Sequence, residues 1–409
     1  MEEAGPVMKI AKGAVSVNGR AAALRAVQNT KMAASAHAYV RGNTVQFYQW
    51  LEAKHSWSIP QGPSIWICGD CHLGNLGPLA DAQGRVQVQI RDLDQTVIGN
   101  PAHDLIRLGL SLATAARGSD LPGITSVRMI ETLMQGYESA FPENDEPPPE
   151  KPRAVKLVMK KAMKRTWKQL ARERIDNADP VIPQGKRFWP LASEERDAIA
   201  ALFSTPSVAE LVTEINSRAD TSRIKVVDAA YWRKGCSSLG RLRYAVLLDV
   251  DGGNVNGDDL CLIDIKEATR AAAPHAPGAA MPRDHAKRVV EGARHLSPAL
   301  GNRMRSATLM DKPVIIRELL PQDLKLEIEH MNRDEAIKAA GFLAGVVGHA
   351  HCRQMDVKTR NAWRKELQRN RSKTLDAPSW LWSSVVDLVA EHERAYLEHC
   401  RKYVLLDNH

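Results

Sequence analysis

The stretch Cys68-Gly69-Asp70-Cys71-His72-Leu73-Gly74-Asn75 decides how the rest of the chain is interpreted. It follows a short apolar run at residues 64–68 that is typical of a buried strand bounded by turns. The alternating residues 86–90 predict a second strand, which leads into Arg91-Asp92-Leu93-Asp94. Phosphoryl transfer needs a carboxylate that orients an acceptor hydroxyl, and an asparagine and an aspartate that hold Mg²⁺ on phosphates. These two segments contain that set of side chains.

With Gly99-Asn100-Pro101-Ala102-His103-Asp104-Leu105, these segments resemble the catalytic and metal-binding loops of aminoglycoside phosphotransferases and other protein-kinase-like enzymes. The resemblance implies that Asp70 is the catalytic aspartate and Asn75 the metal-binding asparagine. It places Asp92 at the metal-binding aspartate, with Asp94 as a second candidate for the same role.

Three neighbouring residues are assigned structural roles. The resemblance places Asp104 where the family has a buried aspartate that braces the catalytic loop, and His72 is interpreted as a supporting histidine. Cys68 stands where the family usually has histidine. Cys68 to His72 also match a haem-attachment pattern or half of a zinc site. However, we expect no export signal at the N-terminus, and the other four cysteines occur singly.

A second group of residues resembles the nucleotide-binding lobe of kinases. A glycine-rich hairpin precedes a strand and then Leu262-Ile263-Asp264-Ile265-Lys266. Backbone N–H groups of such a hairpin can approach phosphates, and a lysine on the next strand can neutralise their charge. The resemblance makes Lys266 the phosphate-binding lysine and Glu291, in a helix expected over 284–296, its ion-pair partner. The hairpin residues assigned to the cofactor are Gly235, Ser237, Ser238 and Gly240.

Each of these assignments has a structural alternative. A glycine pair that flanks a turn is usually only a turn, and the hairpin is not a Walker A loop because Arg241 follows Gly240. Lys266 would then be a solvated lysine at a strand end, and Glu291 an ordinary helix-surface glutamate.

The order of the segments differs from that of kinase-like proteins, because the catalytic loop precedes the small-lobe pattern. The helix expected over 339–351 resembles the one that leads into the catalytic loop of phosphotransferases. We therefore expect an α+β, two-lobed protein-kinase-like fold that is circularly permuted, with the end of this helix beside the 64–68 strand. The expected domains are a helical large lobe at 1–220, a β-rich nucleotide-binding small lobe at 221–322, and C-terminal helices at 323–409 that complete the large lobe.

Most of the chain also resembles a bacterial family catalogued as a domain of unknown function. This second resemblance includes the N-terminal segments Lys31–Ser35 and Tyr39–Gly42. It implies no substrate.

The composition excludes several classes of protein. The chain has 409 residues, 44% of them hydrophobic and 25% charged, which is typical of globular proteins and excludes collagen, low-complexity chains and disulfide miniproteins. Its six cysteines are scattered, and no run of 18 apolar residues occurs. We therefore expect a cytoplasmic protein that has no membrane partner.

The net charge of +8 is concentrated in one segment. Residues 151–175 contain ten Lys or Arg and a single acid, Glu173, whereas the rest of the chain has 46 basic and 47 acidic residues. The spacing predicts an amphipathic helix that follows an acidic, proline-rich linker at 143–150. Its cationic face could be solvated, could border a site for an acidic substrate or nucleotide, or could bind a polyanion.

The sequence predicts an ATP- and Mg²⁺-dependent phosphotransferase that acts on an unidentified small-molecule or protein acceptor. A kinase-fold nucleotidyltransferase or a nucleotide-binding pseudokinase fits the same motifs. The alternative from another class is an adaptor that binds nucleic acid through residues 151–175.

Overall fold

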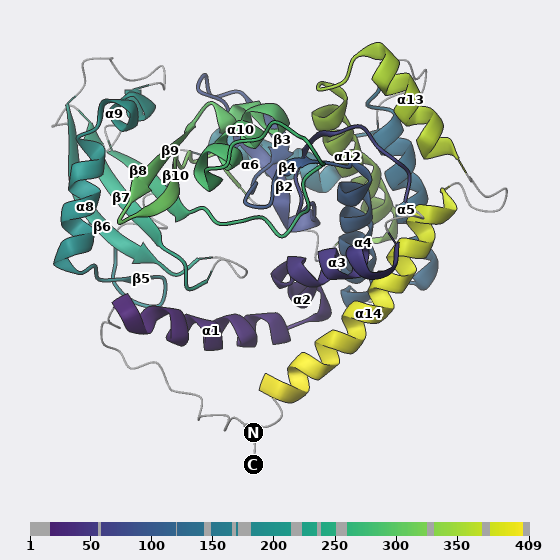
Figure 1. Cartoon of the computed structure of the whole chain (residues 1–409), viewed down its shortest axis with the longest axis horizontal. Helices are drawn as coiled ribbons and strands as arrows, with labels where there is room; N and C mark the ends of the chain where they lie inside the picture. The colour runs from purple at the N-terminus through teal and green to yellow at the C-terminus, as the bar shows by residue number, and fades with distance from the viewer. Residues whose placement is uncertain are drawn as a thin grey trace.

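A computed structural model of the chain describes residues 17–55, 59–119, 121–142, 149–165, 169–170, 181–213, 223–234, 239–250, 260–324, 331–369 and 377–403. Figure 1 shows a strand-rich part on the left and a helical part on the right. The predicted α+β class is therefore confirmed.

Six antiparallel strands form the main sheet, in the order β5-β6-β7-β8-β10-β9. The sequence pattern predicts strands at 224–229, 244–250, 260–265 and 314–320. They are confirmed as β6 (Ile224–Trp232), β7 (Arg243–Val250), β8 (Leu260–Glu267) and β10 (Lys312–Glu318). Two further strands are not predicted: β5 (Phe188–Trp189) is only two residues long, and the middle of β9 (Met304–Leu309) is partly polar.

The two faces of this sheet differ in chemistry because side chains alternate along a strand. One face is apolar and packs against α8 (Ser193–Phe203) and α9 (Pro206–Thr213). At one end of the other face, the register brings together Arg243, Asp264, Lys266 and Arg317. Since β5, α8 and α9 pack with this sheet, its supporting elements begin before the domain boundary expected at residue 220.

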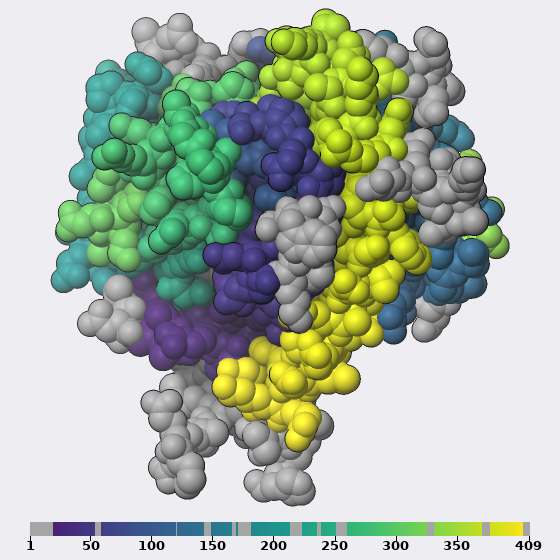
Figure 2. Space-filling model, turned by 45° about the vertical axis from the view of Figure 1, so that its right-hand side comes forward, coloured from purple at the N-terminus to yellow at the C-terminus, as the bar shows by residue number. Residues whose placement is uncertain are grey.

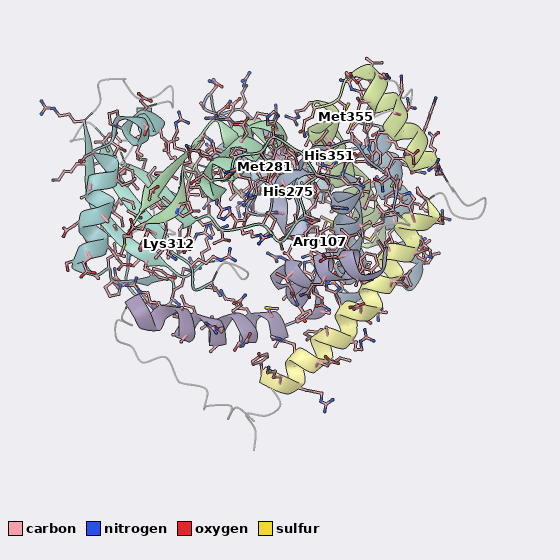
Figure 3. All side chains as sticks on the ribbon, viewed as in Figure 1. Arg107, His275, Met281, Lys312, His351 and Met355 are labelled. Carbon is pink, nitrogen blue, oxygen red and sulfur yellow. The ribbon has the colours of Figure 1, made fainter. Side chains whose placement is uncertain are left out.

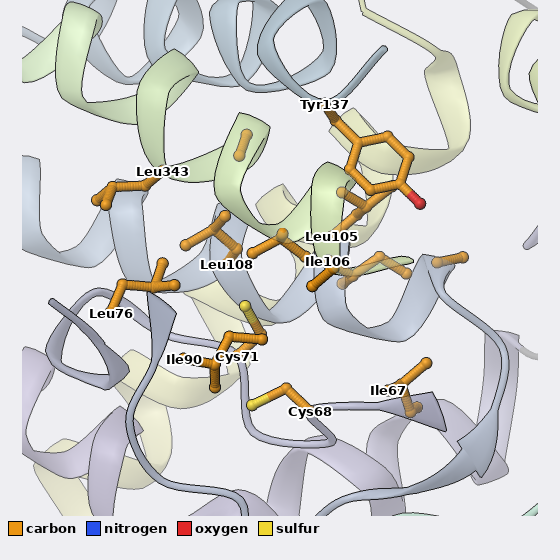
Figure 4. Packing of buried hydrophobic residues seen from close by; sticks show 14 of the residues in the cluster. Ile67, Cys68, Cys71, Leu76, Ile90, Leu105, Ile106, Leu108, Tyr137 and Leu343 are labelled. Carbon is orange, nitrogen blue, oxygen red and sulfur yellow. The ribbon is translucent and has the colours of Figure 1, made fainter. Parts of the chain in front are cut away.

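The helical part packs around α4 (Ala102–Gly118), α5 (Gly123–Glu138) and α12 (Arg333–Cys352). The long helix α14 (Ser379–Tyr403) contacts α4, and α13 (Val357–Gln368) joins the same apolar core. Figure 4 shows Cys68 and Cys71 packed beside α4, with Tyr137 of α5 and Leu343 of α12 above them. Segments from both ends of the chain therefore share one core.

Apolar spacing and the scarcity of helix breakers predict a helical region over residues 18–56, which the structure divides into shorter elements. They are α1 (Val17–Ala33), α2 (Ala36–Gly42), α3 (Thr44–Trp50) and a π-helical turn (Leu51–His55). Ser35 and Asn43 interrupt the helix because their side chains accept hydrogen bonds from Ala38 N at 3.0 Å and Gln46 N at 3.3 Å. Such N-caps begin a new helix.

Helix α1 connects the two parts of the molecule along its lower edge in Figure 1. Near its start, Arg20 forms a buried ion pair with Glu195 of α8 at 2.5 Å. At its end, the Ala33 carbonyl accepts a hydrogen bond from Tyr396 Oη of α14 at 3.0 Å, and His399 of α14 lies 2.9 Å from the Asn29 carbonyl. The helix is therefore fixed at both ends.

Two small sheets and two helices lie between the main sheet and the helical part. The first sheet pairs β1 (Ile65–Ile67) with β4 (Val97–Gly99), and the second pairs β2 (Leu76–Ala80) with β3 (Val86–Ile90). The predicted helix at 284–296 is α10 (His285–Leu296), capped by Asp284 and followed by α11 (Pro298–Gly301).

The basic segment is described at residues 151–165 and 169–170, and it forms α6 (Arg153–Lys164). Val155 and Ala162 are buried and the lysines of α6 are exposed, so the predicted amphipathic helix is confirmed over the residues of α6. The same spacing predicts that Met163 is an apolar contact, but its side chain is 62% exposed. The uses proposed for the cationic face stay predictions.

Among the described residues, no helix combines the length and the apolar composition that a membrane-spanning helix needs.

Two glycines bring α5 and α12 into close contact. A Cβ added at Gly136 would lie 2.0 Å from the Gly341 carbonyl oxygen, and one at Gly341 would lie 2.7 Å from the Thr132 side chain. The two backbones can therefore approach only because neither position has a side chain.

We predict that Gly136→Ala lowers the free energy of unfolding by about 1–3 kcal/mol, because the added methyl group overlaps backbone that cannot move freely. Urea unfolding measures the effect. Gly123→Ala, at the start of the same helix and with open space around its Cβ, is the matched control and should leave stability unchanged or slightly raised. Equal stability of the two variants would contradict the close packing.

Candidate functional site

The loop after β1 is fixed by the carboxylate of Asp104, which lies at the start of α4. Asp104 is fully buried and accepts hydrogen bonds from Cys68 N at 2.7 Å and Gly69 N at 2.9 Å. Gly69 has a φ of +73°, and a Cβ there would lie 2.1 Å from the Gln95 carbonyl oxygen, so the turn requires glycine. Asp104 is therefore hydrogen-bonded to the loop that it was predicted to brace.

A buried chain of hydrogen bonds continues from Asp104 into the helical core. His351 Nε2 of α12 lies 3.1 Å from Asp104, and His351 Nδ1 lies 3.0 Å from Tyr137 Oη. Trp363 Nε1 of α13 donates to Tyr137 Oη at 3.0 Å. Burial raises the pKa of Tyr137, which therefore keeps the hydroxyl proton that it can donate to His351. Sequence reasoning missed Tyr137 and Trp363 because both look like ordinary core aromatics.

The predicted contact between α12 and the 64–68 strand is confirmed. Gln354, just after α12, accepts from Trp66 N at 2.9 Å and donates to Trp66 O at 3.0 Å. Segments almost three hundred residues apart therefore form one structural unit.

Asp70 lies in the loop that Asp104 braces and is held by a buried arginine. Arg107 Nε of α4 donates to Asp70 Oδ1 at 2.9 Å, and Arg107 Nη2 donates to the Val40 carbonyl at 2.6 Å. His72 Nε2 lies 3.8 Å from Asp70 Oδ2. The Asp70 side chain is 14% exposed, so its carboxylate is oriented by these residues and stays accessible.

His72 is close to other basic side chains and is uncharged at neutral pH. Burial lowers its pKa to about 3; Asp70 opposes this shift, whereas Arg41 and Arg107 add to it. Arg41 lies across Gly74, where a Cβ would be 2.8 Å from its guanidinium carbon. The Asp70 loop is therefore bordered by two arginines, and His72 fits the predicted supporting position.

Asn75 joins the two predicted loops. Its Nδ2 donates to the Asp92 carbonyl at 2.8 Å and to the Asp70 carbonyl at 3.2 Å. With the amide nitrogen turned toward the backbone, Oδ1 is the atom of Asn75 that could ligate a cation.

Lys266 of β8 reaches from the main sheet to segment 91–94. Its ammonium lies 3.2 Å from Asp92 Oδ2 and also forms an ion pair with Asp94. Desolvation by the surrounding protein works to raise the pKa of Asp92, but Lys266 and then Arg317 outweigh it, so the pKa lies well below its usual range. Burial and the neighbouring Asp92 charge raise the pKa of Asp94, although Lys266 opposes them.

The predicted pairing of Lys266 with Glu291 is wrong in this structure. Glu291 lies 3.8 Å from Arg294 and 3.4 Å from His295, both of its own helix. The orientation of α10 explains this difference. A Cβ at Gly292 would meet Thr96 at 2.4 Å, and Arg288 donates to the carbonyls of Thr96 and Asp94. The face of α10 that carries Arg288 and Gly292 therefore packs on residues 94–96, and Glu291 lies beside that face.

Further charges tie the sheet to the same segment. The buried Asp264 carboxylate accepts hydrogen bonds from Arg243 at 2.9 and 2.6 Å and from Arg317 at 3.3 and 3.1 Å. Arg317 also donates to the Arg91 carbonyl at 3.2 Å. Burial raises the pKa of Asp264, but the two arginines overcome it, so the pKa lies below its usual range.

The donors fit a Mg²⁺ ion that is held partly by phosphates. Asp92, whose side chain is 51% exposed, offers a carboxylate. Asn75, whose amide nitrogen donates to the Asp92 backbone carbonyl, offers an amide oxygen. Mg²⁺ commonly uses one or two protein ligands together with substrate phosphates. In the described part of the chain, no group of three or more His, Cys, Asp or Glu side chains could hold a metal without such help.

The glycine-rich hairpin is described only at its end. Gly235, Ser237 and Ser238 lie outside the described residues. Gly240 has a φ of +94° and lies against Ala21 of α1, where a Cβ would be 3.6 Å from the Ala21 backbone. Its assignment to the cofactor stays a prediction.

Residues 20–402 match the sequence profile of a family described as "Uncharacterized protein conserved in bacteria (DUF2252)". None of the curated proteins and none of the solved structures compared with the chain matches it.

We predict that Asp104→Asn lowers the free energy of unfolding by about 1–3 kcal/mol. The two carboxylate oxygens each accept from a different backbone N–H group, and the amide nitrogen that replaces one of them would face a donor. Urea unfolding measures the change. Asp387→Asn, at an exposed position of α14, should have no effect. Similar stability of the two variants would mean that Asp104 does not brace the loop.

We also predict that the protein loses stability as the pH falls from about 6.5 toward 4. Burial lowers the pKa values of His37, His103 and His392 to about 4 and that of His72 to about 3, from 6.5 in an exposed chain. The unfolded chain therefore binds protons that the folded chain does not, and each histidine contributes up to about 1.4 kcal/mol per pH unit. Urea midpoints at pH 7.5, 6.0 and 5.0 test this, and His392→Gln should reduce the slope. Constant midpoints would contradict it.

Proposed function

The chain belongs to the DUF2252 family of uncharacterized bacterial proteins, whose description names no activity, and we propose from the geometry of the site that it is an ATP- and Mg²⁺-dependent phosphotransferase. The observation that carries this proposal is the contact of Lys266 with Asp92, next to Asn75 and the Asp70 loop. A phosphate-binding cation, two metal ligands and a carboxylate for the acceptor are the parts that phosphoryl transfer uses.

The order of elements along the chain supports a permuted kinase-like fold. After the glycine-rich segment come strand β7, the lysine strand β8, helix α10 and strands β9 and β10, as the resemblance implies for a small lobe. The contact between Gln354 and Trp66 supports the permutation, because α12 then leads spatially into the loop that carries Asp70.

In the proposed reaction the nucleotide supplies the γ-phosphoryl group, and Mg²⁺ supplies charge neutralisation on the phosphates. Lys266 binds the phosphates, while Asn75 and Asp92 contribute metal ligands. Asp70, oriented by Arg107, accepts the proton of an acceptor hydroxyl. The acceptor oxygen forms a bond to the γ-phosphorus, the bond to the bridging oxygen breaks, and ADP leaves.

Lys266 is neutralised by carboxylates in the structure. Since Asp92 and Asp94 both contact it, phosphates would replace part of this interaction rather than meet an unpaired ammonium. Asp94 takes the ion-pair role that the resemblance gave to Glu291, and Asp92 is the more accessible carboxylate for the metal. The proposed site is therefore built from Asp70, Asn75, Asp92 and Lys266.

We predict that Asp92→Asn and Lys266→Ala each weaken binding of Mg-ATP at least about tenfold, because each removes a charge that faces the ion or the phosphates. Asp70→Asn should retain binding and lose turnover, because it faces the acceptor. Isothermal titration measures binding, and release of ADP measures turnover with water as the acceptor.

Glu291→Gln is the control, because its side chain pairs within α10, and it should bind and turn over Mg-ATP like the parent. Parent-like binding by both Asp92→Asn and Lys266→Ala would show that the site is assigned wrongly. Transfer of the nucleotidyl group would appear as release of pyrophosphate instead of ADP.

A further inference from the structure

A cavity with a volume of about 730 Å³ lies beside the proposed transfer site. Its walls come from α3, the π-helical turn, the start of α4, and the connection of residues 268–284 between β8 and α10. Figure 3 places His275 and Met281 of this connection between the sheet and the helices. In Figure 2 the green surface of this region adjoins the dark purple surface of the N-terminal helices. Asp70, Asn75 and Lys266 are not among the residues that line the cavity.

The charged lining of this cavity is mainly cationic. Arg270, Arg283 and Arg288 line it, and Glu52 is its acidic residue. Arg270 and Arg283 are exposed, and no hydrogen bond or ion pair is formed by either within the part of the chain that the structure describes. Since guanidinium groups match carboxylates and phosphates in geometry, two such groups on one cavity favour an oxyanion.

Buried polar atoms in the wall also lack partners. Arg288 is 2% exposed and uses its two terminal nitrogens on backbone carbonyls, but its Nε has no hydrogen-bond partner among the described residues. Nδ1 of His103 is likewise buried without a partner in the described chain. An unpaired buried polar group costs free energy, and the wall of the cavity therefore holds hydrogen-bonding capacity that the described part of the protein does not use.

The size and apolar parts of the cavity indicate an organic ligand. Leu51, Val97 and Met281 form part of its wall, and its volume lies within the range of small-molecule sites. An inorganic ion would fill only a small fraction of this space. The ligand that fits has an oxyanion at one end and an uncharged body.

We propose that this cavity binds a small organic oxyanion, a phosphate ester or a carboxylate, at a site separate from that of the nucleotide. Two of its residues contact the transfer site. Arg288 donates to the Asp94 carbonyl at 2.9 Å, and Tyr48 Oη donates to the Gly69 carbonyl at 2.7 Å. The wall of the cavity therefore shares two residues with the support of the loops that carry Asp70 and Asp92.

The test is isothermal titration of the full chain with glucose 6-phosphate and with glucuronate, at constant ionic strength. Neutral glucose is the control ligand. At least one of the two anions should bind saturably, and Arg270→Ala and Arg283→Ala should each weaken that binding about tenfold. Both arginines are exposed, so these variants should fold normally. Arg294→Ala, an exposed arginine of α10 that does not line the cavity, should bind like the parent.

A further variant separates this proposal from the proposed function. Lys266→Ala should retain anion binding, because Lys266 does not line the cavity, whatever its effect on Mg-ATP. The absence of saturable binding of both anions to the parent would overturn the proposal. A loss of affinity in Arg294→Ala equal to that in Arg270→Ala and Arg283→Ala would also overturn it. Complete loss of anion binding in Lys266→Ala would do so as well, because it would place the anions at the nucleotide site.

Discussion

The structure depends on one buried carboxylate, that of Asp104. A buried charge is costly unless it is fully hydrogen-bonded, and Asp104 meets this requirement with two backbone N–H groups and His351. Those three partners belong to the loop after β1 and to α12, so satisfying one carboxylate joins three elements. The position of Asp70 follows, because its loop can take no other path while Cys68 N and Gly69 N are bound to Asp104.

The second constraint is electrostatic and joins the sheet to that loop region. Lys266 is almost completely buried, and a buried ammonium needs counter-charges. The segment 91–94 supplies two. Lys266 and Arg317 outweigh desolvation and lower the pKa of Asp92, whereas burial and the neighbouring Asp92 charge raise the pKa of Asp94. Arg317 and Arg288 hold the backbone of the same segment. In the proposed function, this arrangement keeps the metal ligands in place before a nucleotide arrives.

Much of this could be predicted from the sequence, since alternation identified β3, strand-rich composition identified β6, β7 and β8, and the resemblance to kinase-like enzymes identified Asp104. The partner of Lys266 could not. It depends on the rotation of α10 about its axis, which is set by the contact of Gly292 with Thr96, a pair almost two hundred residues apart. The cavity also escaped prediction, because residues 268–284 form an irregular connection whose path no periodic pattern encodes.

Helix α1 has a mechanical consequence. It is anchored to α8 through Arg20 and to α14 through Ala33 and Asn29, so it works as a strut between the sheet and the helical core. Any rotation of one part against the other must pivot about this strut or detach one of its ends. The buried Arg20–Glu195 pair is the costlier end to release, whereas the contacts with α14 are neutral hydrogen bonds. Movement between the two halves is therefore expected to begin where α1 meets α14.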